Sequence, residues 1–202
     1  MKSIVIYFSM SGNTKKIAQQ IRAGISNTGE RCDIARLRDL NTEDLADYRL
    51  IGLGSPILTG KEPSVVSRFI EETMRSVDGK LAFTFSTHGA IPGYYFARVI
   101  PALIQRGLTV IGWNDWFCDV VYPVTPSPYF IAGHPDEIDL KEAEQFGREM
   151  VERARRISDG ETELIPVLAR GKAYDDIYVP VEVPPSRTYP GEFEKFAKAI
   201  SD

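Results

Sequence analysis

The segment that follows the first apolar run of the chain combines the residue types that bind a phosphate. Residues 9–14 contain a flexible glycine, Gly12, and three hydroxyl side chains, on Ser9, Ser11 and Thr14. Apolar residues then recur at helical spacing, at Ile17, Ala18, Ile21 and Ile25. Free amides at the start of a helix and the positive end of its dipole attract an anion, and hydroxyl groups donate further hydrogen bonds. We therefore predict that this turn binds a phosphate.

The composition of the turn narrows the kind of phosphate that it suits. No lysine or arginine lies within residues 9–14, so amides and hydroxyls would hold a terminal monophosphate by geometry. The Gly-Lys-Ser/Thr sequence of a P-loop, which binds a nucleotide triphosphate with magnesium, is absent, as is the G-x-G-x-x-G spacing of dinucleotide-binding proteins. The alternative is an ordinary strand-to-helix turn in which Ser or Asn caps the helix.

The two histidines of the chain are the candidates for proton chemistry or metal binding. His88 lies in the segment Ser86–Ala90 after an apolar run, where it either carries a proton near neutral pH or has no chemical role. His134 lies in the sequence Gly133-His134-Pro135-Asp136, which indicates a turn and a helix cap. Two isolated histidines do not form a ligand set, so we predict no metal site.

Composition and cysteine usage exclude several classes of protein. Cys32 and Cys118 lie on separate predicted strands and form neither a disulfide framework nor a C-x-x-C pair, and an iron-sulfur cluster normally takes four cysteines. The net charge of -4 comes without a basic stripe, so nucleic acid is not an expected partner. The chain has no run of about twenty apolar residues and no signal-peptide layout, from which we expect a cytoplasmic protein without a membrane partner.

Strand and helix patterns alternate along most of the chain. Five runs are typical of strands, the second of them near a sheet edge: Ile4–Phe8, Cys32–Leu37, Leu50–Gly54, Leu81–Phe85 and Leu108–Trp113. Helices are predicted after Thr14, from Pro63 to Met74, from Tyr94 to Arg106, and after a capping box formed by Asp139 and Glu142. Alternation of this kind implies right-handed crossovers onto a parallel sheet.

The turn after the first strand resembles the FMN-phosphate fingerprint of the flavodoxin family, over Tyr7-Phe8-Ser9-Met10-Ser11-Gly12-Asn13-Thr14 with Ile17 and Ala18 behind it. The resemblance covers residues 1–157 and implies an α/β, flavodoxin-like, doubly wound five-stranded parallel sheet of order 2-1-3-4-5. It also implies that FMN lies at the switch point between strands one and three. Its phosphate would then be bound by Ser9, Met10, Ser11, Gly12, Asn13 and Thr14.

By the same resemblance, the loops after strands three and four flank the isoalloxazine ring. The first loop implies cofactor contacts from Ser55, Pro56, Ile57, Leu58, Thr59 and Gly60. The second implies contacts from Thr87, His88, Gly89, Ala90 and Gly93. Backbone groups around Thr59-Gly60 are expected to hydrogen-bond flavin N5, and Gly60 to tolerate the peptide rearrangement that often accompanies reduction in this family. A plain turn glycine is the alternative for Gly60.

His88 is the candidate catalytic residue within these loops. It is expected to donate to the O2/N1 region of the flavin or to act as a proton carrier at the ring edge. The sequence departs from short-chain flavodoxins, which usually stack a tryptophan or tyrosine on the ring, because Ile57, Leu58 and His88 stand there instead. Four aromatic residues are candidates for a stacking face, with simple core packing as the alternative: Tyr94, Tyr95, Trp113 and Trp116.

The chain divides into a predicted FMN-binding domain, residues 1–157, and a proline-rich C-terminal extension, residues 158–202. The apolar content of the extension predicts an arm that packs on the domain or on a partner. A short amphipathic helix is predicted at its end by Phe193, Phe196, Ala197 and Ile200. The motifs at residues 54–57, 85–89 and 133–136 are similar to those of flavodoxin-like proteins from anaerobes that carry a ferredoxin module. The resemblance therefore implies a ferredoxin-type partner, separate from this chain or fused to it.

The leading functional expectation is an FMN-dependent electron-transfer protein that exchanges electrons with iron-sulfur partners. The alternative is an enzyme of the same fold, either a flavin-dependent NAD(P)H or quinone reductase or a protoporphyrinogen-oxidase-like dehydrogenase. A flavin-free interaction module is a third class, and a homodimer is one alternative for the assembly. The fold does not decide among these functions, because one fold supports many sites.

Overall fold

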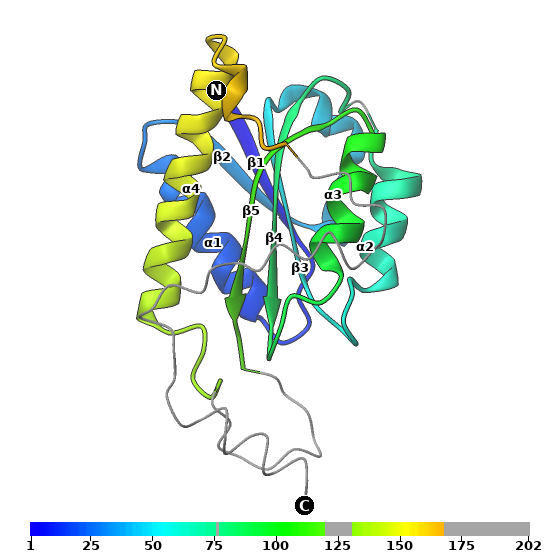
Figure 1. Ribbon diagram of the computed structural model, residues 1–202, viewed down its shortest axis with the longest axis vertical. Coiled ribbons are helices and arrows are strands. Elements are labelled where there is room, and N and C mark those ends of the chain that lie inside the picture. Colours follow the sequence, from blue (N-terminus) through cyan, green and yellow to red (C-terminus); the bar gives the residue numbers. More distant parts are fainter. Residues whose placement is uncertain (76, 120–130, 168–202) are drawn as a thin grey trace, which may run out of the picture. The chain divides into compact units, whose positions relative to one another are not determined.

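A five-stranded parallel sheet forms the centre of the protein (Figure 1). The computed structural model describes residues 1–75, 77–119 and 131–167. The strands follow the spatial order β2-β1-β3-β4-β5, and all four pairings are parallel. Their bounds are β1 (Lys2–Tyr7), β2 (Arg31–Arg36), β3 (Leu50–Pro56), β4 (Leu81–His88) and β5 (Thr109–Phe117). The predicted flavodoxin-like sheet and its strand order are therefore confirmed.

Helices cover both faces of this sheet, as Figure 1 shows. One face carries α1 (Asn13–Ser26) and α4 (Glu137–Ser158), and the other carries α2 (Ser64–Arg68) and α3 (Tyr95–Gln105). Each face buries its own apolar cluster. The cluster under α1 and α4 includes Ile17, Ile21, Phe83, Phe146 and Met150. The cluster under α2 and α3 includes Ile51, Val66, Ile70, Val99 and Leu103. Burial on both faces explains why the central strands are continuously apolar.

The helix predicted over residues 63–74 is interrupted. A π-helical turn, Phe69–Thr73, follows α2 directly, and the Met74 amide donates to the Phe69 carbonyl at 2.8 Å. The wider turn lets Phe69 and Met74 both enter the core, where they are 4% and 0% exposed. Packing against the sheet therefore overrides the regular helical spacing that the sequence suggests.

Two strands continue through segments where the sequence predicts loops. β4 includes Ser86, Thr87 and His88, and it pairs with a longer β5 than predicted, which reaches Phe117. β3 likewise continues to Pro56. Polar residues predicted a loop at these positions. The sheet extends nevertheless, because each of these residues has a ladder partner on the neighbouring strand.

The capping box of α4 lies one turn earlier than predicted. The side chain of Asp136 accepts hydrogen bonds from the amides of Ile138 and Asp139, at 2.8 and 3.0 Å. The carboxylate of Asp139 accepts from the amide of Asp136 at 2.9 Å, and the helix begins at Glu137. The predicted Asp139–Glu142 box is wrong because an aspartate, and not a glutamate, completes the reciprocal pair.

Short helical segments complete the described chain. The connection from β2 to β3 contains two 3-10 helices, η1 (Leu37–Asp39) and η2 (Thr42–Asp47), and a third, η4 (Thr162–Leu164), follows α4. Leu164 and Ile165 pack, partly buried, against the α1/α4 cluster. The predicted proline-rich extension begins at residue 158; its residues 168–202, with the predicted terminal helix, lie outside the described residues. Among the helices that are described, none is long and apolar enough to cross a membrane.

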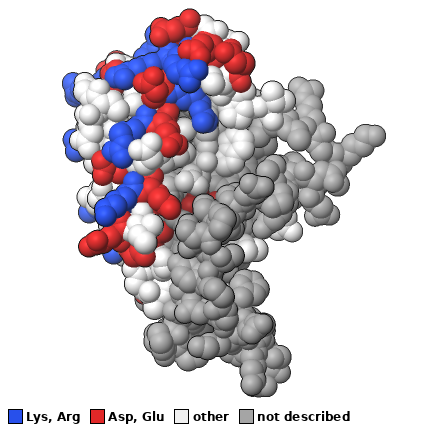
Figure 2. Space-filling view, turned by 60° about the vertical axis from the view of Figure 1, so that its left-hand side comes forward, with Lys and Arg blue, Asp and Glu red and all other residues white. Residues whose placement is uncertain are grey.

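The outer surface around α4 carries charges of both signs (Figure 2). Basic and acidic side chains lie intermixed on this face, and several of them form ion pairs. Arg148 pairs with Glu144 on the same helix, and Arg155 reaches Glu30 at 2.8 Å. Arg156 and Glu161 form an exposed pair, and exposed pairs stabilise a fold by about 0–1 kcal/mol each.

Candidate functional site

The turn after β1 leads into a helix N-terminus without a side-chain cap. Gly12, the cap residue of α1, has a left-handed φ of 97°, and no side chain of the described residues caps the first turn. Helical hydrogen bonds begin with the Lys16 amide, which donates to the Gly12 carbonyl at 3.0 Å. Within the described residues, the amides of Asn13, Thr14 and Lys15 have no acceptor. Three free amides at the positive end of a helix dipole form an anion-binding site.

The side chains of this turn divide into those that shape it and those that are free. The Ser9 hydroxyl accepts from the Gly12 amide at 3.1 Å, and the Asn13 side chain donates to the Asp119 carbonyl at 2.8 Å. Ser9 therefore stabilises the turn itself, and Asn13 connects the turn to the segment that follows β5. Ser11 and Met10 are exposed.

The loop after β3 contains a tight turn with unusual backbone conformation. Leu58 and Lys61 exchange backbone hydrogen bonds of 2.8 and 3.2 Å across Thr59 and Gly60. These two central residues have φ values of 51° and 81°, which define a type I′ turn. Left-handed φ is strained for a β-branched residue such as Thr59, and strain of this kind often marks a functional loop.

One peptide group of this turn has free hydrogen-bonding capacity. In the part of the chain that the structure describes, neither the Thr59 carbonyl nor the Gly60 amide has a partner. The Gly60 carbonyl, in contrast, accepts from the Tyr94 amide at 2.7 Å. Gly93 lies so close that a Cβ there would be 2.3 Å from the Gly60 oxygen. The loops after β3 and β4 are thus held against each other, and the Thr59–Gly60 peptide has no hydrogen bond to the rest of the described chain.

A partly buried ion pair connects the loop after β3 to α3. The Glu62 side chain is 3% exposed, and its two oxygens lie 2.9 and 3.1 Å from Nε of Arg98. The Ser67 hydroxyl donates to the same carboxylate at 2.7 Å. This ion pair cannot be inferred from the sequence, because Glu62 and Arg98 are 36 residues apart and neither belongs to a motif.

His88 lies at the end of β4 as one half of a buried pair. Its Nε2 atom is 2.6 Å from Oδ2 of Asp115 on β5, and its side chain is 3% exposed. Its Nδ1 atom, Oδ1 of Asp115 and the Ser86 hydroxyl are buried without a partner among the described residues. The sequence did not indicate Asp115 as a site residue, because the predicted strand ends at Trp113. The ladder pairing of Ser86 with Asp115 shows that the two strands run on together.

The four aromatic candidates for ring stacking have different surroundings. Trp116 is fully buried, with ring centroids 6.3 Å from Phe85 and 5.7 Å from Phe146. Tyr95 is also fully buried, and its hydroxyl lies 2.9 Å from that of Thr84, so both residues belong to the core. Trp113 packs, partly buried, on the α2/α3 cluster, while Tyr94 is 53% exposed beside the loop after β4.

The remaining predicted contacts surround the same end of the sheet. The Ser55 hydroxyl is committed to the Pro56 carbonyl at 2.8 Å, and Ile57 packs on the α2/α3 cluster. Gly89 and Ala90 follow directly after β4. Because parallel strands place their carboxyl ends at one edge, the structure brings the turns after β1, β3 and β4 together there.

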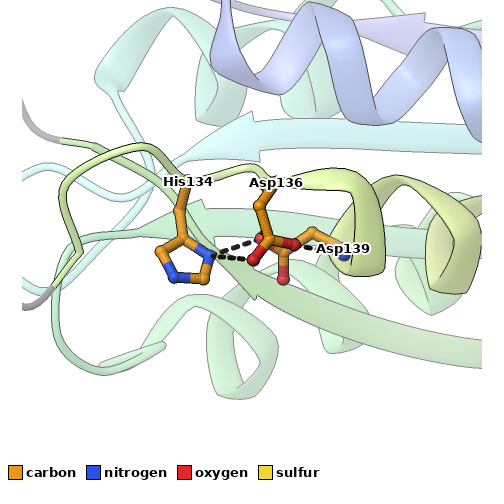
Figure 3. Close-up of side chains that lie close together, drawn as sticks. All are labelled: His134, Asp136 and Asp139. Carbon is orange, nitrogen blue, oxygen red and sulfur yellow. Dashed lines mark hydrogen bonds and ion pairs between the residues drawn. The ribbon is translucent and has the colours of Figure 1, made fainter.

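A second cluster of polar side chains lies at the start of α4 (Figure 3). His134, Asp136 and Asp139 point toward one another, with potential ligand atoms within 4.8 Å. Nδ1 of His134 donates to the Asp139 carboxylate, which also accepts the Asp136 amide at 2.9 Å. The turn and capping role predicted for His134 is confirmed, and these contacts account for the cluster as part of the α4 cap.

Comparison with known proteins identifies the class to which this fold and site belong. A flavodoxin domain model matches residues 4–92. The flavodoxin of Megasphaera elsdenii is 30% identical over 110 residues, which are 54% of this chain and 80% of that protein. A solved flavodoxin from the Archaea has a TM-score of 0.62 at 24% identity, covering 77% of this chain and 99% of that one.

A relative with an enzymatic name matches over a comparable length. The NAD(P)H dehydrogenase (quinone) of Bradyrhizobium sp. is 26% identical over 196 residues, covering 77% of this chain and 98% of that protein. The sheet order, the turn after β1 and these matches together define a flavodoxin-like α/β protein. This chain belongs to the flavodoxin family.

Proposed function

We propose that this protein binds FMN at the carboxyl ends of β1, β3 and β4 and serves in electron transfer. The observation that carries the proposal is the uncapped N-terminus of α1, where three amides have no partner among the described residues. Membership of the flavodoxin family supports electron transfer as the class of function. FMN supplies reversible redox chemistry when it is bound.

The phosphate end of the proposed site depends mainly on the backbone. The amides of Asn13, Thr14 and Lys15 would donate to the phosphate, since the helix dipole favours negative charge there. The exposed hydroxyl of Ser11 is free to add a hydrogen bond. Ser9 acts indirectly, because its oxygen holds the Gly12 amide. A site built on amides and hydroxyls fits a monophosphate group such as that of FMN.

The ring end depends on the unpaired Thr59–Gly60 peptide. Its amide can donate to a ring nitrogen, and its carbonyl can accept from that nitrogen when it carries a hydrogen. The Gly60 carbonyl is held by Tyr94, so any redox-linked rearrangement of this turn involves the Thr59–Gly60 peptide and leaves Gly60–Lys61 in place. The contacts of Gly60 with Gly93 and Tyr94, which hold the loops after β3 and β4 together, keep this peptide in position.

The predicted catalytic residue, His88, would hold a proton beside these loops. The Asp115 carboxylate accepts from Nε2, which orients the ring and leaves Nδ1 to accept or carry a proton. The His88 side chain is 3% exposed and that of Asp115 14%, so the hydrogen bond between them is largely shielded from water. In this proposal Asp115 is the residue that positions His88.

An enzymatic reductase is the second candidate function. The loop after β3 carries Ile57 and Leu58 instead of an aromatic residue, and Tyr95 and Trp116 lie in the core, so neither of these two aromatic residues is available to stack on the ring. The match to an NAD(P)H dehydrogenase (quinone) favours this class of alternative. A carrier that exchanges electrons with an iron-sulfur protein such as a ferredoxin is the first candidate, on the basis of the flavodoxins among the relatives.

One spectroscopic titration tests the binding and separates the two functions. The purified full chain is mixed with FMN, freed of excess ligand and titrated anaerobically with NADH, NADPH and reduced ferredoxin, with free FMN as the control. We expect a protein-bound flavin spectrum that reduced ferredoxin bleaches. Rapid bleaching by a nicotinamide would instead identify a reductase. A protein that stays colourless after addition of FMN would contradict the proposal as a whole.

A further inference from the structure

A buried hydroxyl pair connects the helix N-terminus of the proposed phosphate site to the sheet. Oγ1 of Thr14, on the first turn of α1, lies 2.8 Å from Oγ1 of Thr87 on β4. The two residues are 2% and 3% exposed and 73 positions apart in the sequence. The sequence predicts that Thr87 contacts the flavin directly from a loop. In the structure, Thr87 lies on β4 and its hydroxyl contacts Thr14.

The direction of this hydrogen bond decides what Thr14 can do. A hydroxyl group donates one hydrogen and accepts at its lone pairs. If Thr14 donates to Thr87, the hydrogen of Thr14 points into the sheet and is not available to an anion. If Thr87 donates to Thr14, the hydrogen of Thr14 is free for a phosphate held by the neighbouring amides. Consecutive hydrogen bonds polarise one another. A bound anion therefore favours the arrangement in which Thr87 donates to Thr14.

The thiol of Cys118 is a second hydrogen-bond partner of Thr87. Cys118 is 4% exposed, and burial, followed by the Asp139 carboxylate, raises the pKa of its thiol to about 12, while the hydrogen bond with Thr87 acts in the opposite direction. The thiol is therefore neutral at physiological pH. A neutral thiol can donate to the Thr87 oxygen, which leaves the Thr87 hydrogen for Thr14. No thiolate lies behind the hydroxyl pair to repel a phosphate.

We propose that Thr87 is a positioning residue for the phosphate site: it donates to Thr14, and Thr14 donates to the phosphate, so that Thr87 selects for a phosphorylated ligand without touching it. The inference rests on the proposed binding of FMN. It adds a residue from β4, on the far side of the hydroxyl pair, to a site otherwise built from residues 9–15. It also predicts selectivity between FMN and riboflavin, which lacks the phosphate.

Ligand selectivity in a set of variants tests this role. Dissociation constants for FMN and for riboflavin are measured by flavin fluorescence for the wild type, Thr87→Val and Thr87→Ser. We expect Thr87→Val to weaken FMN binding about three- to tenfold, the range of a lost hydrogen bond, and to leave riboflavin binding unchanged. Thr87→Ser keeps the hydroxyl and should retain the wild-type ratio. A merely structural role for Thr87 would weaken both ligands equally and would overturn the proposal.

A double-mutant cycle with Thr14→Val tests whether the effect of Thr87→Val on FMN binding acts through the Thr14 hydroxyl. Thr87→Val should have no further effect on the FMN-to-riboflavin ratio once Thr14 has lost its hydroxyl. Full additivity of the two changes would contradict the relay. A wild-type chain that does not prefer FMN to riboflavin would refute the phosphate site itself. A wild-type preference that survives Thr87→Val would refute only the role of Thr87.

Discussion

At the scale of single residues, Asp136 shows how one side chain sets the start of a helix. Hydrogen bonds from the backbone amides of Asp139, above all, and of Ile138 hold the pKa of Asp136 below its ordinary value, against the effect of burial. The same two bonds satisfy amides that the helix itself leaves unpaired. The cap therefore links the stability of α4 to the charge of one carboxylate.

Replacing Asp136 by alanine should lower the free energy of unfolding by about 1 kcal/mol at pH 7. The pKa is lower in the folded chain than in the unfolded chain, so this contribution is complete above the unfolded-state value of about 3.9. It is lost as the pH falls through the folded-state value. Urea unfolding of both proteins, compared at equal pH, should show this difference shrinking from pH 7 to acid.

Asp136→Asn is the matched control, because asparagine keeps the capping oxygen without its charge. We expect it to stay close to the wild type at pH 7 and to show less sensitivity to acid. An alanine variant as stable as the wild type at pH 7 would mean that the cap contributes nothing to the fold.

At the scale of elements, two glycines determine how closely α1 and α4 pack. A Cβ on Gly24 would lie 1.9 Å from the Glu144 carbonyl oxygen, and one on Gly147 would lie 2.2 Å from the Ile21 carbonyl oxygen. Both contacts are with backbone atoms, which cannot move aside as a flexible side chain can. The two helices therefore approach backbone to backbone over the sheet.

Gly24→Ala should destabilise the protein by about 1–3 kcal/mol, the usual cost of overpacking. Helix propensity alone predicts the opposite sign, since alanine is more favourable than glycine by about 1 kcal/mol inside a helix. Urea unfolding measures the difference. Gln19→Ala, at an exposed position of α1, is the control and should change the free energy of unfolding by less than about 0.5 kcal/mol. A stabilised Gly24→Ala variant would show that the helices can separate without cost.

At the scale of the whole molecule, cofactor binding and folding are thermodynamically linked. The proposed site is assembled from three turns that come together only when β1, β3 and β4 pair. A ligand that binds only the folded chain stabilises it by an amount set by its free concentration and dissociation constant. The apoprotein is thus expected to be the less stable form.

Free FMN at 100 times its dissociation constant should stabilise the chain by about 2.7 kcal/mol. Thermal unfolding over a series of FMN concentrations checks this, and removal of FMN should return the midpoint to that of the apoprotein. Thr14→Val is the control, because it should need a higher FMN concentration for the same shift. A midpoint independent of FMN would contradict a site formed by the folded sheet.

The amino-acid sequence alone indicated the α/β class, the alternation of strands and helices along the chain, and the turn that is the candidate for phosphate binding. These features depend on local patterns, namely the apolar period of each segment and a glycine among hydroxyls between a strand and a helix. The family resemblance at Tyr7–Thr14 then specified the sheet topology. The core faces of α1 and α4 followed from the same periodicity, because neighbours on a helix face are close in sequence.

Which polar groups lie next to each other depends on the packing of the folded chain. The pairs His88–Asp115 and Thr14–Thr87 join residues 27 and 73 positions apart, and no local pattern encodes a partner at that distance. The polar residues at the end of β4 predicted a loop, because the sequence does not show that they pair with residues of β5. Gly24 resembles a helix-weakening residue until the carbonyl of Glu144 is placed against it. In each case the deciding contact exists only after the sheet and its helices have packed.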